Sequence, residues 1–190
     1  MTPITTERLE IRNFRADDWA ELQEIIVQFQ DSQYSDYDHE WPTSDEKLRE
    51  IAEWFAGGDR FMAVVLKDSG KLIGFISLNP KGEEPHVEFG FGYYFNFNYH
   101  GKGYATEGCQ AVLKHAFDSV HVERITTGTA KENEPSCKLL EGIGMRKTGE
   151  KTASFRKTKD GKPIEFLAHS YSLTREQWFR REEASADPNR

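Results

Sequence analysis

The sequence lacks the features of a membrane-spanning or disulfide-stabilised protein. Its longest uninterrupted apolar stretch, residues 61–66, is far shorter than the about 18 residues that a helix needs to cross a bilayer. It contains only two cysteines, Cys109 and Cys137, which allow at most one disulfide. Residues 1–8 lack the basic and apolar regions of a secretory signal. We therefore expect a cytoplasmic, reduced protein with no membrane partner.

Basic residues are in the minority. Lysine and arginine together number 25, against 32 aspartates and glutamates, so the formal net charge is −7. An excess of negative charge opposes binding to nucleic acid and anionic lipid and weakly favours cationic partners. The histidines and cysteines show no recognised zinc-ligand spacing. We expect neither a nucleic-acid partner nor a metal site.

The chain does contain enough apolar surface for one core. Its 190 residues, 37% of them hydrophobic, suit a single compact domain. We expect this domain to span residues 1–178 and a charged, flexible tail to follow over 179–190. Hydrophobic periodicity predicts the order βααβββαβαββ, an α/β (α+β) fold with a mixed sheet. The expected strands are 9–11, 61–66, 72–78, 87–97, 124–128, 145–151 and 164–173, and the expected helices begin near residues 17, 44, 104 and 133.

The loop at residues 98–107 carries the strongest functional signal. Gly101 and Gly103 follow a strand and open a helix, where unpaired backbone N–H groups and the helix dipole favour an anion. Glycine admits a bulky phosphate to the amides, and Lys102 can add a positive charge. The alternative is a tight strand-to-helix turn without a ligand. A dinucleotide fingerprint and a Walker loop are both excluded, because Thr106 and Gly103 occupy the positions that those motifs assign to Gly and to Ser or Thr.

At this point the sequence resembles the GNAT superfamily of acetyl-CoA-dependent N-acetyltransferases, and within it the RimJ/RimL type that acetylates ribosomal-protein N-termini. The resemblance rests on residues 6–12, 101–107 and 133–145, in the expected order and spacing. It implies a mixed, mostly antiparallel sheet of about seven strands flanked by about four helices. It also implies direct transfer of an acetyl group from acetyl-CoA to a primary amine.

The resemblance assigns the acetyl-CoA site to the phosphate loop, the adjacent strand and the start of the following helix. Asn98 departs from the Arg or Gln that the family often has there. Gly90 and Gly92 in the strand predict a bulge or a close backbone approach, and the family's pantetheine pairs with the edge of this strand. The expected cofactor-binding residues are Tyr93, Tyr94, Phe95, Asn98, His100, Gly101, Lys102, Gly103, Tyr104, Ala105, Asn133, Ser136 and Lys138.

Catalysis requires a proton acceptor for the amine, and departure of the thiolate can use a proton donor. Glu88 is a carboxylate on a strand otherwise built from apolar residues and glycine, and burial would suit it to act as the base. The alternative is an exposed or salt-bridged glutamate at a strand start. Leu140 stands where many family members have a tyrosine acid, so Ser136, Tyr94, water or no acid remain as candidates.

Residues 31–42 form an acidic and aromatic segment between the first two helices, where GNAT enzymes usually build the acceptor site. We expect Tyr34, Asp36, Tyr37, Asp38 and Trp41 to attract and enclose a cationic amine. The alternative is a solvated acidic loop without a function.

A protein or peptide N-terminus is the expected acceptor. At pH 7 roughly one-tenth of an α-amino group is neutral, against fewer than about one in a thousand lysine side chains. The alternatives are a small amine (a polyamine, an amino sugar or a drug) as acceptor, or a non-catalytic acyl-CoA-binding module. The protein is expected to be a monomer or a homodimer.

Overall fold

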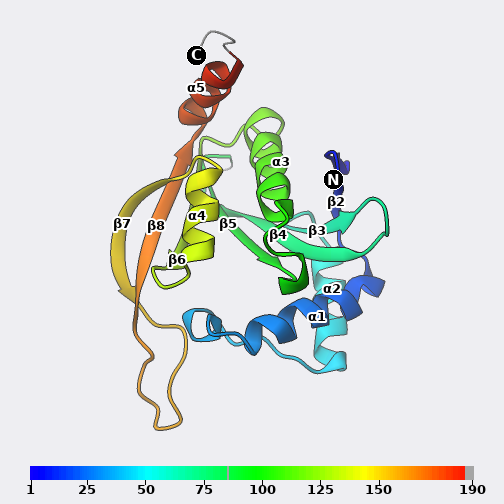
Figure 1. Ribbon diagram of the computed structural model, residues 1–190, viewed down its shortest axis with the longest axis vertical. Coiled ribbons are helices and arrows are strands. Elements are labelled where there is room, and N and C mark those ends of the chain that lie inside the picture. The colour runs from blue at the N-terminus through cyan, green and yellow to red at the C-terminus, as the bar shows by residue number, and fades with distance from the viewer. Residues whose placement is uncertain (85, 187–190) are drawn as a thin grey trace.

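The structure, a computed structural model, describes residues 1–84 and 86–186 and contains one eight-stranded sheet with helices on both faces (Figure 1). The strand order is β1-β2-β3-β4-β5-β6-β8-β7. All neighbouring strands are antiparallel except β5 and β6, which are parallel. The strands are β1 (Ile4–Thr5), β2 (Leu9–Asn13), β3 (Phe61–Leu66), β4 (Leu72–Lys81), β5 (Glu88–Phe95), β6 (Arg124–Ala130), β7 (Arg146–Ala153) and β8 (Phe166–Thr174).

Two apolar cores hold the helices to opposite faces of the sheet. On one face, Val112 and Leu113 of α3 (Tyr104–Asp118) and Leu140 of α4 (Glu134–Gly142) pack in one buried cluster with inward-facing residues of β2 to β6. On the other face, α1 (Trp19–Gln30) and α2 (Asp45–Ala56) bury a second cluster that includes Phe55 and Phe75. The alternation of side chains along a strand therefore assigns each residue of β5 to one of two environments.

The predicted α/β class and the mostly antiparallel sheet are confirmed. Within the described residues there are eight strands and five α-helices, rather than about seven and four. The additional strand is the two-residue β1, and the additional helix is α5 (Arg175–Ala186).

Helix α5 corrects the expectation of a flexible tail from residue 179. Trp178 is 5% exposed and stacks on Phe117 of α3, with ring centroids 5.7 Å apart, and Phe179 also packs against the core. Arg181 donates a hydrogen bond to the Gly142 carbonyl at the end of α4. Apolar anchoring thus continues the helix into the charged segment as far as residue 186; residues 187–190 lie outside the described part.

Strands β5 and β6 separate part-way along their length. Their parallel pairing covers only Glu88–Gly90 and Arg124–Thr126, whereas β6 continues to pair with β8 as far as Ala130. The register between β5 and β4 is continuous from Phe95 to Glu88, so the predicted bulge is absent from that ladder. The glycines instead serve close approach: a Cβ on Gly92 would lie 2.9 Å from Ser77 Oγ. Beyond Gly90 the edge of β5 has no ladder pairing with β6, and Thr127 Oγ1 of β6 donates to the Phe91 carbonyl at 2.6 Å.

Candidate functional site

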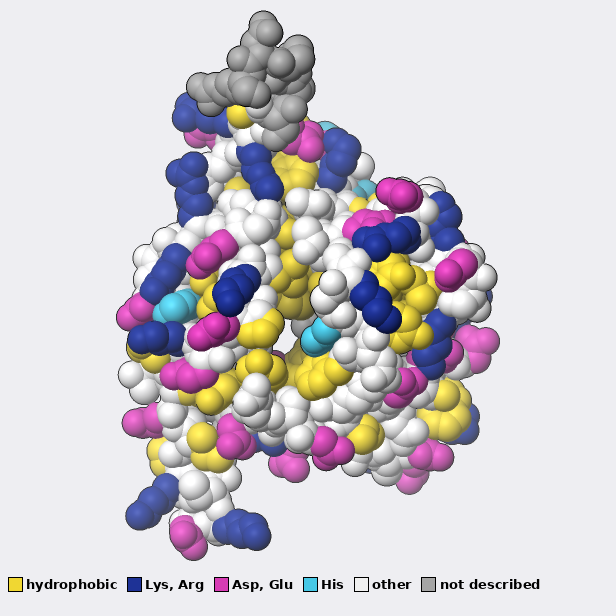
Figure 2. Space-filling model, viewed as in Figure 1, with side chains coloured by type: hydrophobic (Ala, Val, Ile, Leu, Met, Phe, Trp, Pro, Cys, Tyr) yellow, Lys and Arg dark blue, Asp and Glu magenta, His cyan; other side chains and the backbone are white. Residues whose placement is uncertain are grey.

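A cavity of about 1590 Å³ occupies the gap between β5 and β6. It is larger than the roughly 300–1,000 Å³ of a typical small-molecule pocket, so it has room for two substrates. Figure 2 shows a hollow near the centre of the molecule. The predicted residues that line the cavity are Tyr34, Asp38, Glu88, Tyr93, Tyr94, Phe95, His100, Gly101, Gly103, Tyr104, Ala105, Asn133, Ser136 and Lys138. The side chains of Asp36, Tyr37, Trp41, Asn98 and Lys102, all in the described part of the chain, are not among the lining.

The loop at residues 98–107 has a backbone conformation that favours glycine at two positions. Gly101 and Gly103 have φ angles of 73° and 82°, in the left-handed region that favours glycine. Gly103 is the N-terminal cap of α3, and the first N–H groups of an α-helix have no carbonyl partner within it. His100 Nε2 donates to the Phe95 carbonyl at 3.0 Å and joins the loop to β5. One end of the cavity therefore presents backbone donors suited to a phosphate.

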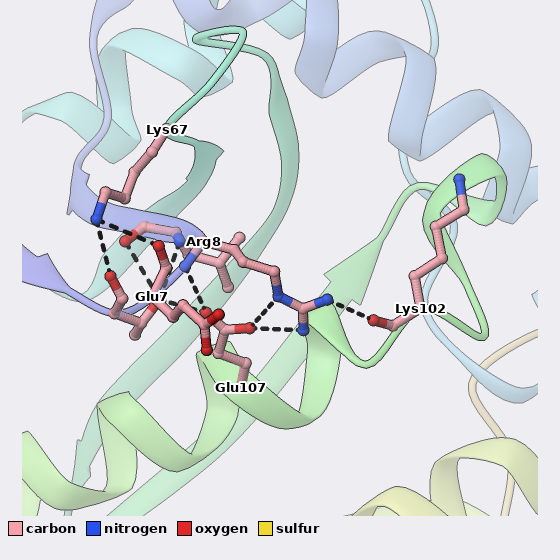
Figure 3. A network of polar contacts seen from close by, with 7 residues as sticks. Glu7, Arg8, Lys67, Lys102 and Glu107 are labelled. Carbon is pink, nitrogen blue, oxygen red and sulfur yellow. Dashed lines mark hydrogen bonds and ion pairs between the residues drawn. The ribbon is translucent and has the colours of Figure 1, made fainter.

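The Lys102 side chain extends away from this cradle. Its Nζ donates to the Asn98 carbonyl at 3.1 Å and lies 5.3 Å from the centre of the Tyr99 ring. Figure 3 shows the ammonium directed away from Arg8. Lys102 thus contributes its backbone to the loop, and its charge stabilises the turn at Asn98.

Arg8, for which the sequence suggested no role, contacts the same loop from outside (Figure 3). Its guanidinium pairs with Glu107 in the first turns of α3, with Nη2 and Oε2 2.6 Å apart, and donates from Nη1 to the Lys102 carbonyl at 2.9 Å. Thr6 Oγ1 also donates to Glu107, at 2.6 Å. Strand β2 and the residues before it are thereby attached to the start of α3.

Tyr93 lies on the face of β5 that α3 and α4 cover. Its hydroxyl lies 2.7 Å from Ser136 Oγ, and Asn133 Oδ1 accepts from the Ser136 amide at 3.3 Å, so Asn133 caps α4 as predicted. Burial raises the pKa of Tyr93 well above its usual range. Tyr93 is therefore a neutral hydroxyl beside Ser136 on the wall of the cavity.

Tyr94 faces the opposite side of the sheet. Its hydroxyl donates to Asp38 Oδ2 and accepts from Trp41 Nε1 at 3.2 Å. Burial, followed by the charge of Asp38 and the hydrogen bond to it, raises the pKa of Tyr94 far above its usual range. The phenol therefore stays protonated and holds the Asp38 carboxylate at the cavity wall.

Glu88 lies at the edge of the cavity and is not fully buried. Its side chain is 31% exposed; it accepts from Thr126 Oγ1 at 2.9 Å and lies 3.7 Å from Lys81 Nζ. Lys81 Nζ also donates to Thr126 Oγ1, at 2.8 Å. The contacts of Glu88 therefore match the alternative of a salt-bridged glutamate better than they match the expected buried carboxylate. Gly90 permits this arrangement, since its Cβ would lie 3.0 Å from the Lys81 Cε.

The segment between α1 and α2 is held by the hairpin that joins β7 and β8. Arg156 donates from Nε to the Asp38 carbonyl at 2.9 Å, and from Nη2 to Gln30 Oε1 at 2.6 Å. The other predicted acceptor residues have structural contacts: the rings of Tyr37 and Phe166 pack 5.2 Å apart, and Trp41 packs against Phe75. Of the four acids at 31, 36, 38 and 40, only Asp38 lines the cavity.

Several cavity residues escaped the sequence analysis. Ser77, Asn79 and Lys81 alternate along β4 and share a face with Glu88, so the strand alternation was an available signal. His169 and the polar run Thr126–Thr129 enter from β8 and β6 through long-range pairing, for which the sequence gives no local signal.

Two negative findings apply to residues 1–84 and 86–186. No helix there has the length and apolar character to span a bilayer. No cluster of three or more His, Cys, Asp or Glu side chains there is arranged to hold a metal ion.

Comparisons with known proteins identify the family. The sequence model of the acetyltransferase (GNAT) domain matches residues 8–146. YnaD of Bacillus subtilis (strain 168), by name an uncharacterized N-acetyltransferase, is 35% identical over 148 residues, which cover 77% of this chain and 84% of YnaD. YdaF of the same organism, provisionally named a ribosomal N-acetyltransferase, is 29% identical over 181 residues, covering 90% of this chain and 94% of YdaF.

The crystal structure of a GNAT-family acetyltransferase from Bacillus anthracis superposes with a TM-score of 0.77 at 30% identity, covering 92% of this chain and 99% of that one. The chain therefore belongs to the GNAT acetyltransferases, which use acetyl-CoA, and the predicted resemblance is confirmed.

Proposed function

We propose that this GNAT enzyme transfers the acetyl group of acetyl-CoA directly to the α-amine of a protein or peptide N-terminus, with both substrates bound in the cavity between β5 and β6. The observation that carries the proposal is the continuity of one cavity between two different ends. One end has the backbone amides of the Gly101–Gly103 loop, and the other has the Asp38 carboxylate held by Tyr94. An anionic co-substrate and a cationic amine suit these ends respectively.

In this proposal the cofactor half acts mainly through its backbone. The amides at the start of α3 bind the pyrophosphate, and the open edge of β5 beyond Gly90 hydrogen-bonds to the pantetheine. A backbone N–H of that edge, aimed at the thioester oxygen, would stabilise the negative charge that develops during amine attack.

The proton transfers are divided between the two faces of β5. Glu88 accepts the amine proton directly or through a water, from the same face as Tyr94. Ser136, whose Oγ contacts Tyr93, donates a hydrogen bond to the departing thiolate on the cofactor face, and the thiolate takes its proton from water. Tyr94 orients Asp38 rather than donating to the thiolate, because its proton is already committed to Asp38. Asp38 then attracts and positions the amine.

The preference for an α-amine has two supports. Its reference pKa of ≈ 7.7–8.0 leaves far more of the reactive neutral form at neutral pH than a lysine has. The relative YdaF, similar over 90% of this chain, carries a name that refers to ribosomal N-acetylation. At the rim of the acceptor half Phe155 is exposed, and a peptide chain that extends from the cavity would contact it there.

Thiol release from acetyl-CoA, measured with a panel of N-terminal peptides, their Nα-blocked lysine-containing counterparts and small amines, tests the proposal. We expect turnover with free N-terminal peptides and little with the blocked ones. Turnover confined to polyamines, amino sugars or drug amines would replace the acceptor. Binding of acetyl-CoA without turnover on any amine would instead indicate a non-catalytic acyl-CoA-binding module.

A further inference from the structure

Arg8 makes a fork of contacts at the base of the phosphate loop (Figure 3). Its Nε donates to Glu107 Oε2 at 2.6 Å, its backbone amide donates to Glu107 Oε1 at 2.9 Å, and its Nη1 donates to the Lys102 carbonyl at 2.9 Å. The guanidinium carbon also lies 4.4 Å from the centre of the Tyr104 ring. One side chain thus holds both a turn residue and the first turns of α3.

The contact with the Lys102 carbonyl affects the amide that follows it. In a trans peptide unit the C=O of one residue and the N–H of the next point in opposite directions within one plane. Because Arg8 holds the Lys102 C=O on the outer side of the loop, the Gly103 N–H is directed to the opposite side. Gly103 also leaves space for this contact, since a Cβ there would lie 3.3 Å from Arg8 Nη2.

The contact with Glu107 affects the charge of the site. Burial opposes ionisation of Glu107, but the hydrogen bonds from Thr6 and Arg8 outweigh it and lower the pKa of this carboxyl. An ionised glutamate within a turn of the helix start would repel a phosphate. The Arg8 guanidinium compensates that charge at a separation of 2.6 Å.

We propose that Arg8 is a positioning residue for cofactor binding, which directs the Gly103 amide toward the phosphate and neutralises Glu107 beside it. The inference rests on the proposed function only for the location of the phosphate. It predicts that Arg8 contributes to CoA affinity in two separable ways. It orients the peptide unit between Lys102 and Gly103, and it compensates the charge of Glu107.

Calorimetric titration with CoA and with 3′-dephospho-CoA tests the proposal on four variants: Arg8→Met, Arg8→Lys, Glu107→Gln and the double variant Arg8→Met/Glu107→Gln. We expect Arg8→Met to weaken both ligands about tenfold, as loss of a charge-assisted hydrogen bond does. The KM for acetyl-CoA should rise similarly while kcat stays within about twofold. The loss of CoA affinity should grow as the salt concentration is lowered, because the charge of Glu107 is then less screened.

The double variant should recover part of the CoA affinity, because the uncompensated charge is also removed. Arg8→Lys should remain weakened, because an ammonium cannot contact both Glu107 and the Lys102 carbonyl as the guanidinium does.

Lys67→Met is the matched control. Lys67 Nζ donates to the carbonyls of Thr6 and Glu7 and attaches the same segment, but it contacts neither Lys102 nor Glu107. Its CoA affinity should equal that of the unchanged protein even where its melting temperature falls.

An Arg8→Met protein that melts at a lower temperature but binds CoA within twofold of the unchanged protein would overturn the proposal. If Gly103→Val abolishes CoA binding in the same assay, the assignment of the phosphate site to this loop still stands even when the Arg8 proposal fails. If the unchanged protein does not bind CoA, the proposed function itself is wrong.

Discussion

The two ends of the cavity are built in different ways. The proposed cofactor end centres on one continuous stretch, residues 98–107, where two left-handed glycines shape the turn and the distant side chain of Arg8 contacts it; its proposed binding groups are backbone amides. The acceptor end is assembled from distant segments by side chains: Tyr94 contacts Asp38 across 56 positions, and Arg156 contacts it across 118. A local backbone site depends mainly on the conformation of its loop, whereas an assembled site depends on each side-chain contact.

The difference predicts which changes affect only one substrate. Changes in the loop should alter binding of acetyl-CoA and leave the acceptor KM unchanged. Changes at Asp38 or its partners should do the reverse. The following substitutions examine this separation in order of decreasing effect.

Gly103→Val should weaken CoA binding by about 100-fold or more, because a β-branched residue at a φ of 82° is strained and the phosphate amides lose their directions. Calorimetry with CoA measures this. Gly58→Ala is the control, since its added Cβ would meet nothing within 4 Å. Equal CoA affinity in Gly103→Val would exclude this loop as the phosphate site.

Glu88→Gln should lower kcat about 100-fold, the lower range of general-base contributions, while the KM for acetyl-CoA stays within about twofold. The amide can still accept from Thr126 but cannot take the amine proton. Steady-state kinetics with a saturating peptide acceptor measure the effect. An unchanged kcat would remove Glu88 as the base and leave its pairing with Lys81 as a structural contact.

Asp38→Asn should raise the acceptor KM about tenfold, because the neutral amide no longer attracts an ammonium in a partly buried site. Tyr94→Phe should act in the same direction by releasing Asp38. The matched control is Asp36→Asn, an exposed acid on the same segment that does not line the cavity. If Asp36→Asn raised the acceptor KM as much as Asp38→Asn, general charge of the segment would explain the effect.

Arg156→Met should raise the acceptor KM about fivefold, since the segment that carries Asp38 loses its hydrogen bonds to the β7–β8 hairpin. Hydrogen exchange of the amides around residues 31–42 should quicken, while the amides of the phosphate loop keep their rates. Lys157→Met, at the exposed neighbouring position, is the control. Faster exchange in both regions would mean that the two ends are not independent.

The same contrast explains what could be predicted from the sequence. The order of the predicted elements and the cap at Asn133 follow from local patterns, and the structure has them, with β1 and α5 in addition. The direction of the Lys102 ammonium does not, because a nearby carbonyl competes for it.

The acceptor end was harder to predict for a physical reason. Composition alone gives Asp36 and Asp38 the same chance of reaching the cavity, and the choice between them is made by Tyr94 and by an arginine that lies 118 residues further on. Trp41 is likewise placed by packing against Phe55 and Phe75, which belong to other elements. Such tertiary contacts determine the site, and no window of the sequence contains both partners.

The smallest effect is expected at Glu24 of α1, the helix that precedes the acceptor segment. Its carboxylate accepts from Lys71 Nζ at 2.8 Å and from Nδ2 of the fully buried Asn96 at 2.7 Å, and Asn96 in turn accepts from the Asn98 amide of the phosphate loop. The hydrogen bond from Lys71, and then that from Asn96, outweigh burial and lower the pKa of Glu24. The folded protein therefore binds fewer protons here than the unfolded chain. This contribution to stability is present above the usual glutamate pKa of about 4.3 and is lost as the pH falls through the lower folded value.

Glu24→Gln should reduce the free energy of unfolding by about 1 kcal/mol or less near neutral pH, because the side chain is 38% exposed and solvent screens the pair. Urea unfolding near neutral pH and again well below the usual glutamate pKa measures the difference, which should shrink at the lower pH. A difference that stays constant with pH would assign the effect to the hydrogen bond with Asn96 and would show that the ion pair with Lys71 does not stabilise the fold.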